Sequence, residues 1–167
     1  VIKKMDGANG DVPLENTITI YLFPTKKWKK ALKETIVHEL AHALSPYYCK
    51  DFNLGNMFVF DGIAEHFREY FVGGKRAPWT KAISKRESIR LFKKLKKKIN
   101  SKNDGLYRDV FFGTGKYPLW AGYTMGYYIV EDYLKKQKKI NWEKIIKTKP
   151  KVILKEFLLN SRNEKQI

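Results

Sequence analysis

Apolar and polar residues alternate near the start of the chain, after a polar, turn-rich opening. Over residues 17–23 the apolar positions are Ile18, Ile20 and Leu22, with polar or aromatic residues between them. A period of two is typical of a half-buried strand, and Pro24 ends it. A second short apolar run, residues 57–60, is interpreted as a further strand.

Elsewhere the apolar residues recur at helical spacing. A long helix is expected over residues 26–44, with Thr25 as its N-cap, and its second half is apolar around most of its circumference. Asp61 is interpreted as the cap of a helix over residues 62–72. Further helices are expected within residues 75–102, where one face is basic, over 118–134, and as two short pieces within 141–161.

This pattern predicts an α+β fold that is mostly α-helical, with a small β-sheet near the N-terminus. The length of 167 residues suits a single domain over residues 1–167, and no internal repeat is visible. The chain starts at Val1 instead of Met, so we expect that an upstream segment was removed. Such a segment could have held a signal or an anchor, and a cytoplasmic location is only the working expectation.

Composition narrows the picture further. The chain has one cysteine, which excludes a disulfide within it. It contains no run of eighteen apolar residues, so the sequence does not predict a transmembrane segment. Lys and Arg number 34 against 17 Asp and Glu, which gives a net charge of +17. Such a charge favours weak, non-specific binding to anionic surfaces, with residues 75–102 as the natural footprint. A general lysine-rich composition explains the charge as well, and no nucleic-acid motif accompanies it.

Residues 38–42 read His-Glu-Leu-Ala-His, and this motif carries the chemistry of the chain. His38 and His42 are four residues apart, so they lie on one face of a helix and can bind one zinc ion. Glu39 is turned away from that face and suits the role of general base beside an attacking water. The competing interpretation is a pair of core histidines satisfied by hydrogen bonds.

A catalytic zinc ion needs a third protein ligand. The downstream candidates are Asp51, Asp61, Glu65, His66 and Glu69. Glu65 and Glu69 form an acidic stripe on an otherwise apolar helix, so we expect Glu65 to bind the metal and Glu69 to orient a metal-binding histidine. A solvated acidic face paired with lysines would explain the same stripe. His66 is interpreted as a packing or substrate-side residue.

Three stretches of the chain resemble a known family: residues 35–44, 61–67 and 117–130. They are similar to the gluzincins and, more closely, to the predicted zinc-dependent protease family called YjaZ-like. The resemblance implies a zincin-like fold, with the sheet over the zinc-binding helix, one Zn²⁺ ion and a peptidase activity. Two departures stand out: Asp61 replaces a glutamate of the family pattern, and Glu69 stands where many gluzincins have an aspartate.

Two further roles are expected around such a site. Tyr123 and Tyr127 are four residues apart on a glycine-rich helix, and Tyr123 is the first choice for stabilising the oxyanion of peptide hydrolysis, although simple helix packing would also explain both. The strand before the motif helix would bind an extended substrate through Ile20, Tyr21 and Leu22, unless it is only part of the core.

The sequence therefore predicts a zinc metallopeptidase acting on a peptide or protein substrate, with Glu39 as general base. The alternative is a catalytically silent or latent binding module on the same scaffold, blocked by the segment after Ser161, with the basic surface binding an anionic partner.

Overall fold

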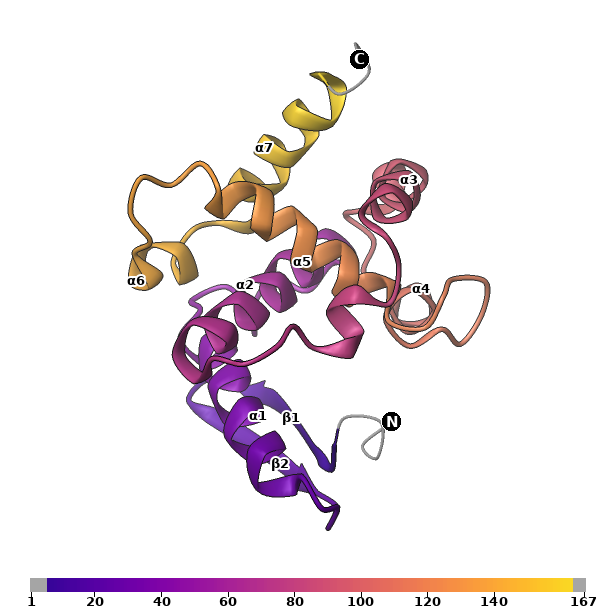
Figure 1. The fold of residues 1–167 in the computed structure, drawn as a ribbon. Helices are drawn as coiled ribbons and strands as arrows, with labels where there is room; N and C mark the ends of the chain where they lie inside the picture. Colours follow the sequence, from indigo (N-terminus) through magenta and orange to yellow (C-terminus); the bar gives the residue numbers. More distant parts are fainter. Residues whose placement is uncertain (1–5, 164–167) are drawn as a thin grey trace.

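The computed structural model describes residues 6–163, and it opens with a β-hairpin (Figure 1). Strands β1 (Ala8–Leu14) and β2 (Thr17–Leu22) pair antiparallel and form a two-stranded sheet. The alternating pattern predicted β2 correctly. Strand β1 was missed because its residues are mostly small or polar, and only Ala8 and Val12 are buried.

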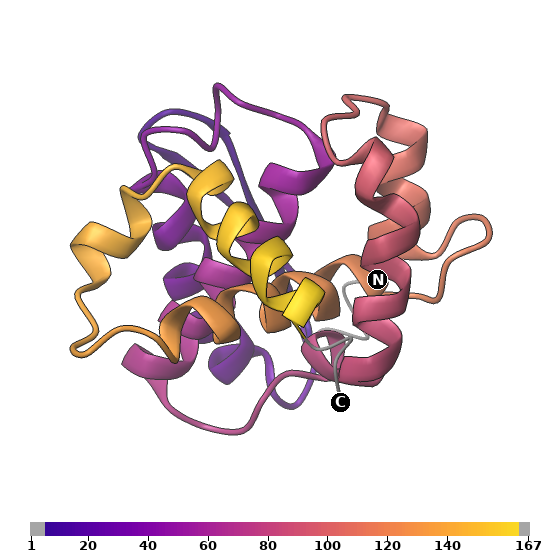
Figure 2. The same ribbon diagram turned by 90° about the horizontal axis from the view of Figure 1, so that it is seen from above.

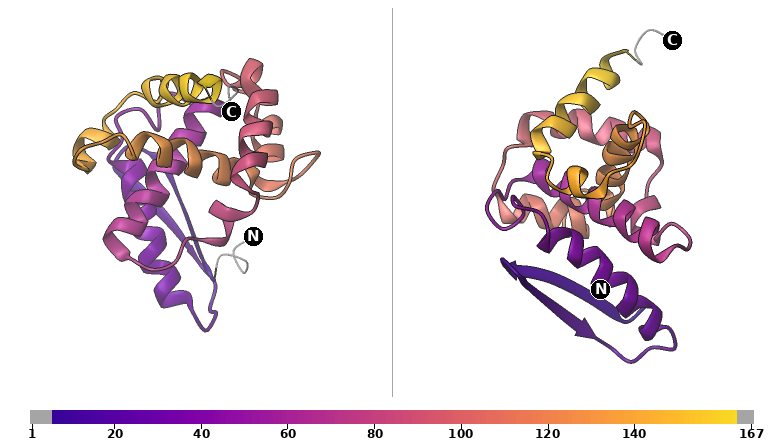
Figure 3. Two further views of the ribbon diagram at one scale, coloured as in Figure 1. Left: turned by 45° about the horizontal axis from the view of Figure 1, so that its top comes forward. Right: turned by 90° about the vertical axis from the view of Figure 1, so that its left-hand side faces the viewer.

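Helix α1 (Trp28–Ala43) carries the motif residues, and the hairpin lies along it (Figure 3, right). Strand β1 approaches very closely at Gly10, where an added Cβ would lie 2.5 Å from Cγ of Glu39. Only a residue without a side chain fits between the strand and Glu39. The expected small sheet over the motif helix is therefore present.

Helix α2 (Leu54–Val72) corrects two predictions made for this region. Residues 57–60 are helical, so the expected strand is wrong, and Asp61 lies within the helix and does not cap it. The cap is Asn53, whose side chain accepts a hydrogen bond from the backbone N–H of Asn56 at 2.9 Å. Residues 54–65 are all buried, so the segment shows no polar face from which a helical period could be recognised.

Helix α5 (Ala121–Leu134) packs against α2 at the centre of the molecule (Figure 1). The two backbones meet at Gly62 and Gly126. A Cβ on Gly62 would collide with the carbonyl of Gly126, and a Cβ on Gly126 would collide with the carbonyl of Phe58. The two helices can therefore approach this closely only with glycine at both positions.

The remaining elements surround this pair. They are η2 (Pro78–Lys81), α3 (Lys85–Leu95), η3 (Lys96–Lys98), α4 (Asp104–Phe112), α6 (Trp142–Ile146) and α7 (Pro150–Asn163). Helix α7 crosses over α2 and α5 (Figure 2). Helix α4 was not predicted, whereas the expected amphipathic, basic helix is present as α3, which buries Leu91, Phe92 and Leu95. Binding of its basic face to anionic surfaces stays a prediction.

The predicted fold class is confirmed: the chain is α+β, mostly helical, with a small N-terminal sheet. Over residues 6–163, none of the helices combines the length and the apolar character that a membrane crossing requires. The tail beyond Asn163, which includes most of the segment named above as a possible block of the site, lies outside the described residues.

Candidate active site

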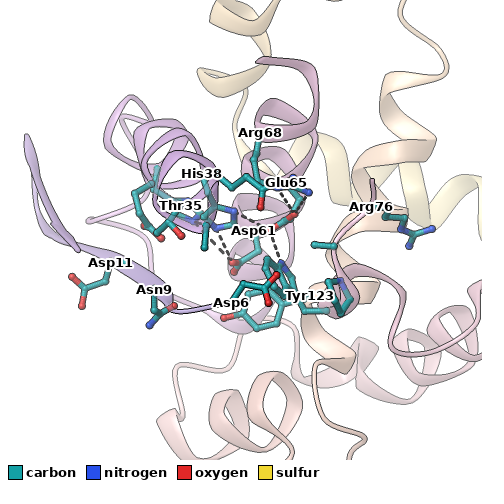
Figure 4. Close-up of a pocket in the computed structure, with 18 of the residues that line it drawn as sticks. Asp6, Asn9, Asp11, Thr35, His38, Asp61, Glu65, Arg68, Arg76 and Tyr123 are labelled. Atoms are coloured by element: carbon teal, nitrogen blue, oxygen red, sulfur yellow. Dashed lines mark hydrogen bonds and ion pairs between the residues drawn. The ribbon is translucent and has the colours of Figure 1, made fainter. Parts of the chain in front are cut away.

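A cleft of about 430 Å³ opens beside α1, and its walls come from distant parts of the chain. Strand β1, helices α1 and α2, the segment 75–79, α4 and α5 all contribute lining residues. His38, Glu39 and His42 of α1 all line this cleft, and Figure 4 shows His38 pointing from α1 toward Asp61 and Glu65 of α2. In the second half of α1, Glu39 and His42 are buried against this cleft, whereas the apolar residues Ile36 and Leu40 are exposed.

Two histidines and one carboxylate converge at the cleft. The Nε2 atoms of His38 and His42 lie 3.1 Å apart. The Oδ1 atom of Asp61, from α2, lies 3.7 Å from Nε2 of His38 and 3.9 Å from Nε2 of His42. These three atoms form a compact group that could hold a metal ion.

The group fits a zinc ion. Ligands about 2.0–2.1 Å from zinc in a tetrahedron lie about 3.3 Å from one another, close to the distances seen here. The other carboxylate oxygen of Asp61, Oδ2, is buried and has no hydrogen-bond partner among the described residues. A cation beside Asp61 would compensate for the cost of burying that oxygen.

Glu65 lies one helical turn after Asp61 and contacts the opposite side of the His38 ring. Its Oε1 lies 3.0 Å from Nδ1 of His38 and accepts a hydrogen bond from Nε1 of Trp79 at 2.6 Å. Its Oε2 accepts two hydrogen bonds from Arg68, at 3.1 and 3.0 Å. The structure thus brings Asp61, and not Glu65, to the Nε2 atoms of the two histidines.

Burial and neighbouring charges shift the pKa values of this cluster. Burial by itself lowers the pKa of His38, but its contacts with Asp61 and Glu65 raise it to about 10. Burial raises the pKa of Glu39 to about 7, against the opposing charge of His38. For Glu65, burial acts upward, yet His38, Arg68 and Trp79 together lower the pKa to about 2.

Glu69 takes a position different from the one that the sequence suggested. Its Oε1 accepts a hydrogen bond from Arg68 at 3.3 Å, and its Oε2 accepts one from the hydroxyl of Tyr127 at 2.9 Å. Glu65 occupies the place beside a histidine that was expected for Glu69. His66 packs on the ring of Tyr127, with centroids 4.1 Å apart, as expected for a packing residue.

Tyr123 lines the cleft on the side of Asp61 that faces away from Arg68 (Figure 4). Tyr48 and Tyr107 line it as well, and the ring of Tyr48 stacks on His42 with centroids 4.1 Å apart. None of the three hydroxyls has a hydrogen-bond partner within residues 6–163. Sequence reasoning missed Tyr48 and Tyr107, because nothing in their spacing separates them from the other tyrosines.

The cleft meets the hairpin through β1 and not through β2. Asn9, Gly10 and Asp11 of β1 line the cavity, whereas Ile20, Tyr21 and Leu22 of β2 are not among its lining residues. These three β2 residues pair with β1 across the sheet; Ile20, for example, lies opposite Gly10. Strand β1 therefore lies next to the motif helix at the point where β2 was expected.

Comparison with known proteins adds one finding. The chain matches none of the curated proteins and none of the solved structures with which it was compared. A family model does match, over residues 1–155, and it includes every residue of the metal-facing group and the YjaZ-like stretches. The chain therefore belongs to the family described as "Predicted Zn-dependent protease (DUF2268)".

Proposed function

We propose that this protein is a zinc-dependent peptidase whose metal ion is held by His38, His42 and Asp61. The observation that carries the proposal is the convergence of these three ligand atoms in an open cleft, with a glutamate on the adjacent helix position. A structural zinc site closes its coordination with four protein ligands. Three ligands facing a cavity leave a position for water and substrate.

Asp61 is preferred to Glu65 as third ligand because the two carboxylates differ in the hydrogen bonds that they already accept. Both oxygens of Glu65 are already engaged, by His38, Trp79 and Arg68. One oxygen of Asp61 has no hydrogen-bond partner within residues 6–163, and the other lies beside the two Nε2 atoms. A carboxylate that accepts from Nδ1–H of a histidine fixes the tautomer in which Nε2 is free to bind metal.

A bound zinc ion would supply Lewis acidity, which polarises the scissile carbonyl and makes water a better nucleophile. Glu39 takes the proton from the attacking water and passes it to the leaving amine. It lies beneath β1 and next to His38, so it is held at the edge of the cleft. Peptide hydrolysis needs both transfers, because an unprotonated amine leaves poorly.

Two further assignments support substrate binding. The hydroxyl of Tyr123 has no partner in the described chain and is free to donate to the developing oxyanion. The segment that lines the cleft at Asn9 and Asp11 belongs to a two-stranded sheet, so the unpaired edge of β1 is the natural place for an extended peptide. The substrate strand is accordingly proposed on β1.

Incubation of the zinc-loaded protein with a mixed peptide library, read by mass spectrometry, tests the proposal. The wild type should cut peptides, and Glu39→Gln should bind zinc equally well but leave the library intact. Zinc binding by both proteins without cleavage by either would favour the alternative, a binding module or a latent site.

A further inference from the structure

We propose that Trp79 and Arg68 are positioning residues, which hold the carboxylate of Glu65 against the ring of His38 and keep it out of the metal coordination. The inference rests on the proposed zinc site, but it assigns a role to two residues that take no part in the chemistry.

Every acceptor position of Glu65 is accounted for by this arrangement. The carboxylate is 1% exposed, and Oε1 is shared by Nδ1 of His38 and Nε1 of Trp79. Oε2 is held by a two-pronged contact with Nε and Nη2 of Arg68. Because different donors hold the two oxygens, the plane of the carboxylate is fixed, and it cannot turn toward the metal without breaking charged hydrogen bonds.

Trp79 is itself held from α5. The hydroxyl of Thr124 donates to the backbone carbonyl of Trp79 at 2.8 Å and accepts from the backbone N–H of Ala82 at 3.1 Å. Thr124 is completely buried, so these bonds are shielded from water. The indole N–H therefore reaches Glu65 from a backbone that the core of the molecule fixes.

Arg68 is held in the same rigid manner. Its guanidinium is buried at 2% exposure and also contacts Glu69 at 3.3 Å and Glu34 at 3.8 Å. Three carboxylates from two helices thus surround one cation. This arrangement leaves the guanidinium plane little freedom, and through Glu65 it fixes the orientation of His38.

Removal of the Trp79 N–H should therefore weaken metal binding without touching a ligand. Loss of partners that orient a metal-binding histidine costs roughly 10–100-fold in metal affinity. For Trp79→Phe we expect the dissociation constant for zinc to rise about 10-fold. The substitution keeps an aromatic ring in place and deletes the donor that Oε1 of Glu65 uses, together with the second ring of the indole.

Trp142→Phe is the matched control. Its indole nitrogen is buried without a hydrogen-bond partner in the described chain, so the same substitution there removes no bond. Zinc affinity is measured for both variants and the wild type by competition with a chromophoric chelator. The visible spectrum of the Co²⁺-loaded proteins and the melting temperature of the metal-free proteins are recorded alongside.

The proposal expects weaker zinc binding and an altered Co²⁺ spectrum in Trp79→Phe alone. Equal zinc affinity in all three proteins would overturn it while leaving the zinc site intact. No zinc binding by the wild type would instead overturn the proposed function, and the positioning role with it. If metal-free Trp79→Phe melts well below the control, Thr124→Val is measured in its place. This substitution frees the backbone of Trp79 but keeps its indole. The proposal then requires that Thr124→Val weaken zinc binding, and unchanged zinc binding would overturn it.

Discussion

The two histidines of the cleft are held by walls of opposite character. On the side of His38, the polar groups of Glu65, Arg68 and Trp79 are paired with one another at 2.6–3.1 Å. On the side of His42, the wall is aromatic: Tyr48 stacks on the imidazole, and the tyrosine hydroxyls lining the cleft have no partner in the described chain.

This difference separates the residues that fix the geometry of the site from those that can bind a substrate. A wall whose donors and acceptors are all used can fix geometry but has nothing to offer a substrate. A wall with unused donors costs stability and is retained where a ligand completes it. We call Glu65, Arg68 and Trp79 the paired wall, and Tyr48, Tyr107 and Tyr123 the aromatic wall. We expect substitutions on the paired wall to affect stability and metal binding, and substitutions on the aromatic wall to affect catalysis.

Glu39, beneath β1 at the edge of the cleft, should show the largest effect on rate. Glu39→Gln removes the general base, which typically costs about 10²–10⁴-fold in rate. The side chain keeps its shape, so zinc affinity should be unchanged. Steady-state peptide cleavage and chelator competition measure the two properties. Retained cleavage in Glu39→Gln would exclude this residue as the base.

Arg68→Met tests the paired wall by breaking it. Glu65 would stay buried and Glu69 half-buried without their cation, so the free energy of unfolding should fall by about 3–5 kcal/mol. Urea denaturation of the metal-free protein measures this loss. The matched control is Arg108→Met, because Arg108 pairs with Asp104 at the surface and should contribute less than about 1 kcal/mol. Equal losses in both variants would remove the distinction.

Tyr123→Phe tests the aromatic wall. Loss of an oxyanion donor costs about 10²–10³-fold in kcat. The hydroxyl has no partner in the described chain, so stability should change little. Peptide cleavage and urea denaturation are compared on the same preparation. A stability loss with unchanged kcat would return Tyr123 to a packing role.

Tyr127→Phe gives the smallest expected effect and the inverse pattern. Its hydroxyl donates to Glu69 at 2.9 Å, and Glu69 contacts Arg68 of the paired wall. Its removal should lower the free energy of unfolding by about 0.5–1.5 kcal/mol. The value of kcat should stay close to that of the wild type. A large loss of kcat would show that the paired wall takes part in the chemistry.

The sequence predicted the parts of the fold where one face is buried and the other is wet. Helix α3 has that pattern, with Leu91, Phe92 and Leu95 buried. Strand β2 was predicted from its alternation alone, because none of its residues is fully buried. The sequence did not predict strand β1, because its position depends on Gly10 and on pairing with β2, not on its own apolar residues. Helix α2 was divided wrongly because residues 54–65 are buried on all sides.

The same limits apply to the site. His38, Glu39 and His42 come from one helix, so their spacing alone predicted their common location. Asp61 was assigned to a cap because the helix was expected to begin at Gly62, although it begins at Leu54. Trp79 and Tyr48 reach the cleft only through tertiary packing, which no local pattern encodes.

The central claim is that His38, His42 and Asp61 bind the metal while Glu65 holds His38. Anomalous diffraction at the zinc edge from crystals of the zinc-loaded protein tests it directly. We predict one peak about 2.0–2.2 Å from Nε2 of both histidines and from an oxygen of Asp61, with Glu65 still on Nδ1 of His38. A peak bound by Glu65 in place of Asp61, or no peak in this cleft, would contradict the account.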